Sequence, residues 1–152
     1  MSVFVVDASV AVKWMLPEPL SAEAVLLQSP EHQLHVPSFF EIELANILWK
    51  KVRQGLLGRP QADQFLSQLP GLPLARHTDA SLVAAAFDLA DRAGRTVYDC
   101  MYLALAVQLD ARMVTADERL VNGLANGPWA DHVIRLQDVF LNENWHPKMI
   151  GE

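Results

Sequence analysis

Residues Val97–Leu109 read V-Y-D-C-M-Y-L-A-L-A-V-Q-L, an apolar run that carries one carboxylate, Asp99, close to its start. Apolar residues on every side of a helical projection predict a helix that is buried all round. Asp99 in the first turn of this helix gains about 0.3–1 kcal/mol from the helix dipole. That gain is small against the cost of burying an unpaired charge, so we expect a positively charged partner for Asp99.

Short apolar strands alternate with helices along the rest of the chain, and turns containing Pro or Gly separate them. The periodicity predicts strands over Val3–Val6, Leu34–Val36, Leu74–His77, Met113–Val114 and Val133–Leu136. It predicts helices over Ser9–Met15, Ser21–Gln28, Phe39–Arg53, Pro60–Gln68, Asp79–Ala93, Tyr98–Leu109 and Glu118–Ala125. Strands joined through helices need crossover connections, which indicates an α/β fold with a mainly parallel sheet covered on both faces.

The composition limits the class of protein. The chain has 152 residues, 51% of them hydrophobic and 20% charged, which is typical of a globular protein. We predict one domain over residues 1–140 and a C-terminal tail over residues 141–152. The single cysteine, Cys100, and the lack of a membrane-spanning run or a basic signal region favour a cytoplasmic protein. The net charge of −6 argues against broad attraction to nucleic acid, although bound divalent cations can supply positive charge locally.

Two acids directly follow predicted strands. Asp7 ends V-F-V-V-D at residues 3–7, and Asp117 lies in V-T-A-D-E-R-L at residues 114–120. Ligands of parallel sheets bind beyond the carboxyl ends of the strands, so both acids are candidate site residues. Both positions also suit helix N-caps. Asp7 or Ser9 could cap the first helix, and Thr115 with Glu118 has the spacing of a capping box.

The helix predicted over Phe39–Arg53 carries a narrow polar stripe that contains Glu43 and Asn46. Apolar residues such as Trp49 cover most of its remaining surface, so we expect burial on more than one side. The stripe is either a solvated salt-bridging face or part of a functional site. Basic residues at and beyond the end of this helix either contact phosphates of a nucleic acid or form an ordinary solvated helix end: Lys50, Lys51, Arg53 and Arg59.

A doubly wound sheet can gather acids from strand ends and helices at one edge. The acids in question are Asp7, Glu43, Asp99 and Asp117. Clustered carboxylates repel one another unless a cation neutralises them. Oxygen ligands without a Cys or His cluster favour Mg²⁺ or Mn²⁺ over zinc. Such a metal suits phosphodiester hydrolysis, because it can activate a water, polarise the phosphoryl oxygen and stabilise the leaving oxygen.

In its motifs the chain resembles the VapC-type toxins of bacterial toxin–antitoxin pairs, which are PIN-domain ribonucleases. The matching motifs follow the family's order: D-A-S at residues 7–9, P-S-F-F-E-I-E-L-A-N-I-L at residues 37–48, V-Y-D-C-M-Y-L-A-L-A at residues 97–106 and T-A-D-E-R-L at residues 115–120. The third motif is similar to the family's Tyr-Asp-x-x-Tyr helix, with Asp99 as its acid. The resemblance covers nearly the whole chain.

The resemblance implies a three-layer α/β/α PIN-like fold with a parallel sheet. It also implies a toxic Mg²⁺-dependent RNA endonuclease of a type II pair, usually a homodimer, which a cognate VapB-like antitoxin inhibits. The implied catalytic metal ligands are Asp7, Glu43, Asp99 and Asp117. Ser9 and Thr115 would support these ligands, and Asn46 would lie behind them or face RNA. Magnesium would then be the positive partner of Asp99, while Glu118 is left outside the site as the capping-box acid.

Two other functions remain open. The first is a phosphatase or phosphotransferase with Asp7 as its nucleophile. Such an enzyme would be expected to have a second acid at position 9, where this chain has Ser9, and a positioned lysine. The second is a catalytically silent PIN-like scaffold that only binds a protein partner. Loss of an acid would favour the scaffold, and none of the four is lost.

Overall fold

The computed structural model describes residues 2–141, so residues 142–152 of the predicted C-terminal tail lie outside the described part. Five strands form one sheet: β1 (Ser2–Val6), β2 (His32–Pro37), β3 (Leu74–His77), β4 (Arg112–Thr115) and β5 (Val133–Arg135). The order is β3-β2-β1-β4-β5, and every neighbouring pair is parallel. The prediction of a mainly parallel sheet is confirmed, and β1 lies at its centre.

Helices make the connections between these strands. They are α1 (Ala8–Met15), α2 (Ser21–Leu26), α3 (Phe40–Arg53), α4 (Arg59–Gln68), α5 (Val83–Ala93), α6 (Val97–Gln108) and α7 (Glu118–Leu124). Within residues 2–141, none of them is both long and apolar enough to cross a membrane. The helix predicted over Asp79–Ala93 is divided, because Asp79–Ser81 forms a 3₁₀ turn and α5 begins only at Val83. The Asp79 side chain accepts a 3.0 Å hydrogen bond from the backbone N–H of Phe39, which holds this turn against the start of α3.

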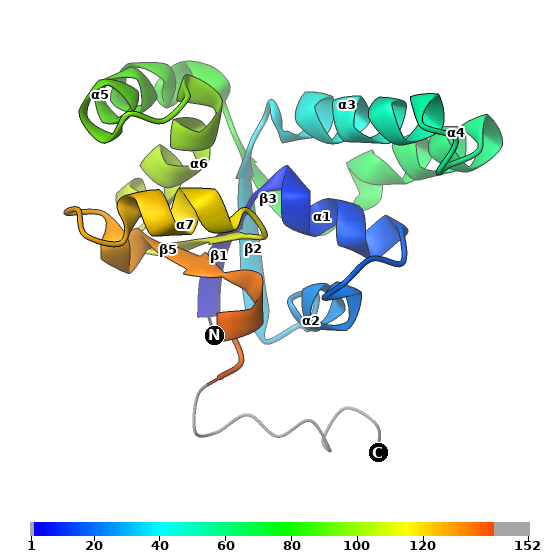
Figure 1. Ribbon diagram of the computed structural model, residues 1–152, viewed down its shortest axis with the longest axis horizontal. Helices are drawn as coiled ribbons and strands as arrows, with labels where there is room; N and C mark the ends of the chain where they lie inside the picture. The colour runs from blue at the N-terminus through cyan, green and yellow to red at the C-terminus, as the bar shows by residue number, and fades with distance from the viewer. Residues whose placement is uncertain (1, 142–152) are drawn as a thin grey trace.

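The two faces of the sheet bury separate cores. Side chains alternate between the faces along a strand. Val5 of β1 therefore contributes to a core with α3, α5 and α6, whereas Phe4 and Val6 contribute to a second core with α2 and the 3₁₀ turn Leu136–Asp138. In Figure 1, α5 and α6 lie to one side of β1 and β2, and α1 and α2 lie to the other. The fold is the expected three-layer α/β/α arrangement.

The two helices that carry candidate acids are buried to different degrees. Every residue of α6 from Cys100 to Ala106 is buried, which confirms the prediction from its apolar sequence. The expectation for α3 is wrong, because Ile42 is 74% exposed and Trp49 is 58% exposed. Only one side of α3 packs on the core, through buried residues that include Leu44 and Leu48. The sequence of α3 is apolar on several faces, and from this pattern alone the faces that pack on the core could not be told from those that are exposed.

Gly94, whose backbone has a left-handed conformation, sets the direction of α6. Gly94 ends α5 with φ of 69°, and its backbone N–H is bonded to the carbonyl oxygen of Ala90. Glycine is the residue best suited to this conformation because it has no Cβ. The chain reverses there and enters α6 through Thr96, whose side chain caps the helix. This short connection brings the first turn of α6, and with it Asp99, back toward the sheet.

Candidate active site

Asp7 lies at the carboxyl end of β1, where it caps the amino terminus of α1. Its Oδ1 accepts hydrogen bonds from the backbone N–H of Ser9 (2.7 Å) and from the Ser9 hydroxyl. Its Oδ2 accepts a 2.6 Å hydrogen bond from the Thr115 hydroxyl. Asp7 is only 6% exposed, and this burial raises its pKa, while the three hydrogen bonds oppose the rise. The N-cap alternative is therefore correct for Asp7, and it holds the same carboxylate at the ligand-binding edge of the sheet.

Thr115 and Ser9 connect the ends of two adjacent strands. The buried Thr115 hydroxyl, which donates to Asp7, also accepts a hydrogen bond from the backbone N–H of Asp117 (3.0 Å). The Ser9 hydroxyl oxygen accepts one from the backbone N–H of Ala116 (3.1 Å). The strand order reverses between β1 and β4, which is the switch point at which doubly wound sheets bind ligands. Both residues expected to support the site thus bond directly to Asp7.

Glu43 lies in the first turn of α3 and faces α6. The hydroxyl of Tyr102, a buried residue of α6, donates a 2.8 Å hydrogen bond to Glu43 Oε1. Burial raises the pKa of Glu43 to about 7 against the effect of this hydrogen bond, and the charges of Asp7 and Asp99 add to the rise. Glu43 is therefore held near two other candidate acids by a residue from a different helix.

Asp99 lies half-buried in the first turn of α6, where its backbone N–H donates to Thr96 Oγ1 (3.1 Å). Burial raises the pKa of Asp99, and the charge of Asp117 adds to the rise. A hydrogen bond with the Thr96 side chain and the charge of Arg95 oppose it. The Arg95 guanidinium lies against Gly123 of α7, at a position that a Cβ on Gly123 would overlap. Arg95 is thus one positive neighbour of the kind that the burial of Asp99 led us to expect.

Asp117 is exposed and caps the amino terminus of α7. Its Oδ1 accepts hydrogen bonds from the backbone N–H groups of Arg119 (3.0 Å) and Leu120 (3.3 Å). This is the structural role that its position at a helix start allowed. The charge of Asp117 nevertheless acts on Asp99, which places the two carboxylates in the same region.

The capping box predicted for Thr115 and Glu118 is wrong. Helix α7 begins after Asp117, and the side chain of Asp117, not that of Thr115, accepts the hydrogen bonds from the first backbone N–H groups of α7. The Glu118 carboxylate instead contacts Arg135 (3.6 Å) and accepts a hydrogen bond from the Gln137 side chain (3.0 Å). The Thr115 hydroxyl donates to the buried Asp7 carboxylate, and this bond satisfies both groups away from water.

Electrostatic repulsion links the four candidate acids, Asp7, Glu43, Asp99 and Asp117, which come from the end of β1, α3, α6 and the start of α7. The charge of Asp99 raises the pKa of Asp7, and the charges of both raise that of Glu43. Asp117 acts in the same direction on Asp99. The fold therefore brings together side chains that are far apart in the sequence.

The donor set fits a magnesium ion. All four groups offer carboxylate oxygens, and the raised pKa values of Asp7, Glu43 and Asp99 are those of buried acids beside like charges. Among residues 2–141, no three His, Cys, Asp or Glu side chains are arranged to enclose a metal by themselves. Mg²⁺ typically binds through one or two carboxylates and keeps several waters, so it does not need such an enclosure. A cation there would relieve the repulsion among the acids.

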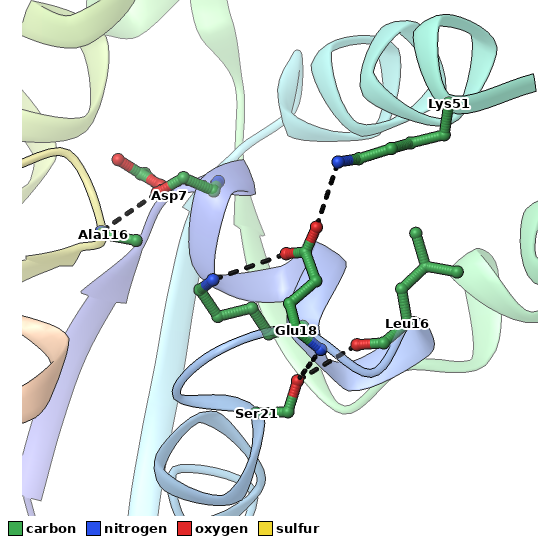
Figure 2. Close-up of polar contacts among 8 residues, drawn as sticks. Asp7, Leu16, Glu18, Ser21, Lys51 and Ala116 are labelled. Carbon is green, nitrogen blue, oxygen red and sulfur yellow. Dashed lines mark hydrogen bonds and ion pairs between the residues drawn. The ribbon is translucent and has the colours of Figure 1, made fainter. Parts of the chain in front are cut away.

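The remaining candidates lie on α3 and beyond it. Asn46 is exposed one turn after Glu43. Several of the basic residues proposed as RNA contacts have local partners: Lys51 pairs with Glu18 (3.1 Å), Arg59 pairs with Asp63 (2.8 Å) and Arg53 lies over the Trp49 ring. Figure 2 shows Asp7 beside Ala116 on one side and the Lys51–Glu18 ion pair on the other. Because these basic residues already have local partners, we favour the interpretation that they form an ordinary solvated helix end and do not contact RNA.

Two residues at the site were not assigned a role from the sequence. Tyr102 is the second tyrosine of the Tyr-Asp-x-x-Tyr motif, and its bond to Glu43 joins positions 59 residues apart. A buried tyrosine hydroxyl needs a partner, which was a usable signal, although the sequence could not identify the partner. Arg95 follows the Gly94 turn directly. Arg95 lies next to the glycine that ends α5 and four residues before Asp99. This spacing was a second usable signal, because it indicated a positive partner for Asp99.

Comparison with known proteins supports the same fold. The model of the PIN domain family matches residues 4–123. The chain is 37% identical over 118 residues to Ribonuclease VapC3 of Pyrobaculum aerophilum, covering 76% of this chain and 90% of that protein. The crystal structure of PAE2754 from Pyrobaculum aerophilum matches with a TM-score of 0.69 at 21% identity, over 91% of this chain and 86% of that one.

A toxin–antitoxin complex from Klebsiella pneumoniae matches with a TM-score of 0.55 at 12% identity, over 90% of this chain and 98% of that one. Both structural likenesses show the fold alone, whereas the family model and the VapC3 relative show the family. The acids at the switch point occur in the order and on the elements that the VapC resemblance implied. The chain therefore belongs to the PIN-domain family, as a VapC-type member.

Proposed function

We propose that this chain is a toxic, Mg²⁺-dependent endoribonuclease of a type II toxin–antitoxin pair, acting in the cytoplasm. The observation that carries the proposal is the gathering of Asp7, Glu43, Asp99 and Asp117 at the switch point of a parallel sheet. Membership of a family whose relatives include a protein named Ribonuclease VapC3 supplies the substrate class. We further propose that the domain spans residues 1–140.

In this proposal the residues of the site have different roles. Asp7 and Asp99 would bind the cation, with Glu43 and Asp117 as further ligands directly or through water. When bound, the divalent ion supplies Lewis-acid chemistry, which lowers the pKa of a water and stabilises the leaving oxygen of the phosphodiester. Thr115 and Ser9 fix the orientation of the Asp7 carboxylate through the bonds described above.

Glu43 has a second role in this proposal. Its pKa is about 7 in the metal-free protein, and bound Mg²⁺ would lower it, so Glu43 would be ionised and could accept a proton from an attacking water. Tyr102 would hold one carboxylate oxygen of Glu43 in place through its 2.8 Å hydrogen bond. The other oxygen would be the one that faces the reacting water. Asn46, one turn away on α3, would face the RNA.

We propose a VapB-like antitoxin and a second copy of the chain as protein partners. The antitoxin would inhibit cleavage by covering the acids. Support comes from VapC-type membership and from the Klebsiella pneumoniae neighbour, which was solved as a toxin–antitoxin complex. The homodimer rests on the family resemblance alone. Growth arrest on expression of the chain, relieved by co-expression of the antitoxin, is the expected cellular result.

Cleavage of total RNA by the purified chain, freed of antitoxin, tests the proposal. Reactions would contain Mg²⁺, Mn²⁺ or EDTA, and each would be run with Asp99→Asn and with Asp88→Asn. Asp88 is an exposed acid that pairs only weakly with Arg92 (3.5 Å), so it is a matched control for the same substitution. We expect discrete, metal-dependent fragments from the wild type and from Asp88→Asn, and none from Asp99→Asn.

Two outcomes would contradict the proposal. Cleavage that resists EDTA and survives in Asp99→Asn would exclude the carboxylate-bound metal as the catalytic centre. A folded wild type that binds Mg²⁺ but cleaves no RNA would favour the silent scaffold that the sequence left open. Metal binding is measured separately, by the rise in melting temperature on addition of Mg²⁺, because a ligand that binds only the folded state stabilises it.

A further inference from the structure

An exposed aromatic ring lies immediately beside the candidate acids. Tyr98 precedes Asp99 in the first turn of α6 and is 67% exposed. Its ring centroid lies 6.1 Å from that of Phe39, with an angle of 36° between the planes. The ring is thus held on one side by another aromatic side chain while much of its surface faces solvent. Tyrosine is enriched at interfaces, because its ring offers apolar surface and its hydroxyl a polar contact.

Phe39 ties this ring to the catalytic acids. Its ring centroid lies 5.2 Å from that of Tyr102, whose hydroxyl donates to Glu43. Its carbonyl oxygen accepts a 3.0 Å hydrogen bond from the backbone N–H of Glu43. The backbone N–H of Phe39 is itself fixed by Asp79 (3.0 Å). A continuous aromatic series therefore leads from the Glu43 carboxylate through Tyr102 and Phe39 to the surface at Tyr98.

The net charge of the chain limits its general attraction to RNA phosphates. Proteins that bind nucleic acid mainly through phosphates neutralise them with Lys and Arg. This chain has a net charge of −6, and Lys51 and Arg59 are already engaged by acids. Aromatic stacking needs no positive charge and tolerates every base, because each base has a flat π-face. A stacking ring beside the acids would supply affinity that the phosphate contacts cannot.

We propose that Tyr98, supported from behind by Phe39, stacks on an unpaired nucleobase of the RNA and so positions the neighbouring phosphodiester at the acids. The inference rests on the proposed ribonuclease function and adds a positioning residue to it. A base must leave its own helix before it can stack on a protein ring, so the stacking is expected with single-stranded or loop RNA and not with duplex RNA. Tyr98 is then a positioning residue for RNA.

Binding measurements separate this inference from the nuclease itself. A pool of short single-stranded RNAs carrying a fluorescent adenine analogue would be titrated with Asp99→Asn protein, in which cleavage is blocked. Stacking on Tyr98 is expected to quench the analogue, and a duplex of the same strands is expected to give no quenching. We expect Tyr98→Ala to weaken binding by about ten-fold and to abolish the quenching, since stacking on one ring contributes roughly that factor per base.

The variants include a rescue and a matched control. Tyr98→Phe keeps the ring and is expected to bind within about two-fold of the parent, whereas Tyr98→Leu keeps only apolar surface and is expected to behave as Tyr98→Ala. Phe87 on α5 is also 67% exposed and lies about two helical turns, or about 10 Å, before the Gly94 reversal. Phe87→Ala is expected to leave both affinity and quenching unchanged.

Steady-state cleavage by variants with Asp99 intact adds an independent readout. Tyr98→Ala is expected to raise KM on single-stranded RNA by about ten-fold with a smaller change in kcat, because it removes binding and not chemistry. Unchanged affinity in Tyr98→Ala, or an equal loss in Phe87→Ala, would overturn the inference. So would a variant that keeps RNA binding and loses antitoxin binding, which would assign the ring to a protein interface. A wild type that cleaves no RNA would defeat the proposed function, while the binding titration would still decide the role of Tyr98.

Discussion

The hydroxyl of Thr115 donates a 2.6 Å hydrogen bond to Asp7 Oδ2 and so joins two residues that are 108 positions apart. Both groups are buried, and they lie at the carboxyl ends of adjacent strands, β4 and β1. The bond exists because the chain crosses over β2 and β1 between β3 and β4, which places the fourth strand beside the first. It fixes the orientation of the carboxylate that is central to the candidate site.

Removal of this donor should destabilise the protein. Thr115→Val preserves shape but leaves Asp7 Oδ2 without its buried partner, and we expect the free energy of unfolding to fall by about 1–3 kcal/mol. Thr115→Ser keeps the hydroxyl and is expected to lose less. Urea denaturation of the three proteins measures the difference. A Thr115→Val protein as stable as the wild type, or less destabilised than Thr115→Ser, would show that the bond contributes little.

The stability of the metal-free protein should depend on pH through Glu43. Its pKa is about 7 in the folded protein against an ordinary value of 4.5, so between these pH values the folded state holds an additional proton. The contribution of Glu43 to the free energy of unfolding therefore falls as pH rises from about 4.5 to about 7 and is constant above that range. Glu43→Gln cannot ionise and should lack this decline.

The measurement is the difference in free energy of unfolding between wild type and Glu43→Gln across that pH range, in EDTA. We expect the wild type to lose stability relative to the variant as pH rises. Addition of Mg²⁺ should reduce the loss, since the cation stabilises the ionised carboxylate. A difference that is independent of pH would mean that Glu43 ionises in the folded protein as it does in the unfolded chain.

The Tyr102 hydroxyl should lower the pKa of Glu43. Tyr102→Phe removes the donor that stabilises the ionised carboxylate, so the pKa of Glu43 should rise further. In RNA cleavage the acidic limb of the pH–rate profile should therefore move to higher pH. Tyr98→Phe is the matched control, because it makes the same substitution at an exposed ring, and its profile should coincide with that of the wild type. Coincident profiles for all three proteins would contradict the assignment.

Gly123 and Arg95 should be energetically coupled. Replacing a glycine within a helix by alanine normally stabilises a protein by about 0.5–1 kcal/mol. A Cβ at position 123 would overlap the Arg95 guanidinium, so in the wild-type background we expect this gain to be lost. In an Arg95→Ala background the space is open and the gain should return. Urea denaturation of the four proteins of this double-mutant cycle measures the coupling, and strictly additive effects would exclude it.

The sequence by itself determined the elements and supplied the candidate acids. Periodicity located every strand of the sheet and the helices between them, because exposure repeats with the geometry of each element. Asp7 and Asp117 could be placed at strand ends for the same local reason. The apolar run around Asp99 correctly predicted the burial of Cys100–Ala106 in α6, whereas Tyr98 at the start of this helix is exposed.

Only the tertiary structure decided which residues meet. The strand order brought Thr115 to Asp7, and Asp117 caps α7 in place of the capping box that the local sequence allowed. The packing of α6 against α3 brought Tyr102 to Glu43, and the approach of Arg95 to Gly123 depends on α7. Local sequence fixes backbone conformation within a few residues, whereas these contacts depend on crossover connections and on the burial of whole faces, which no single stretch of the chain encodes.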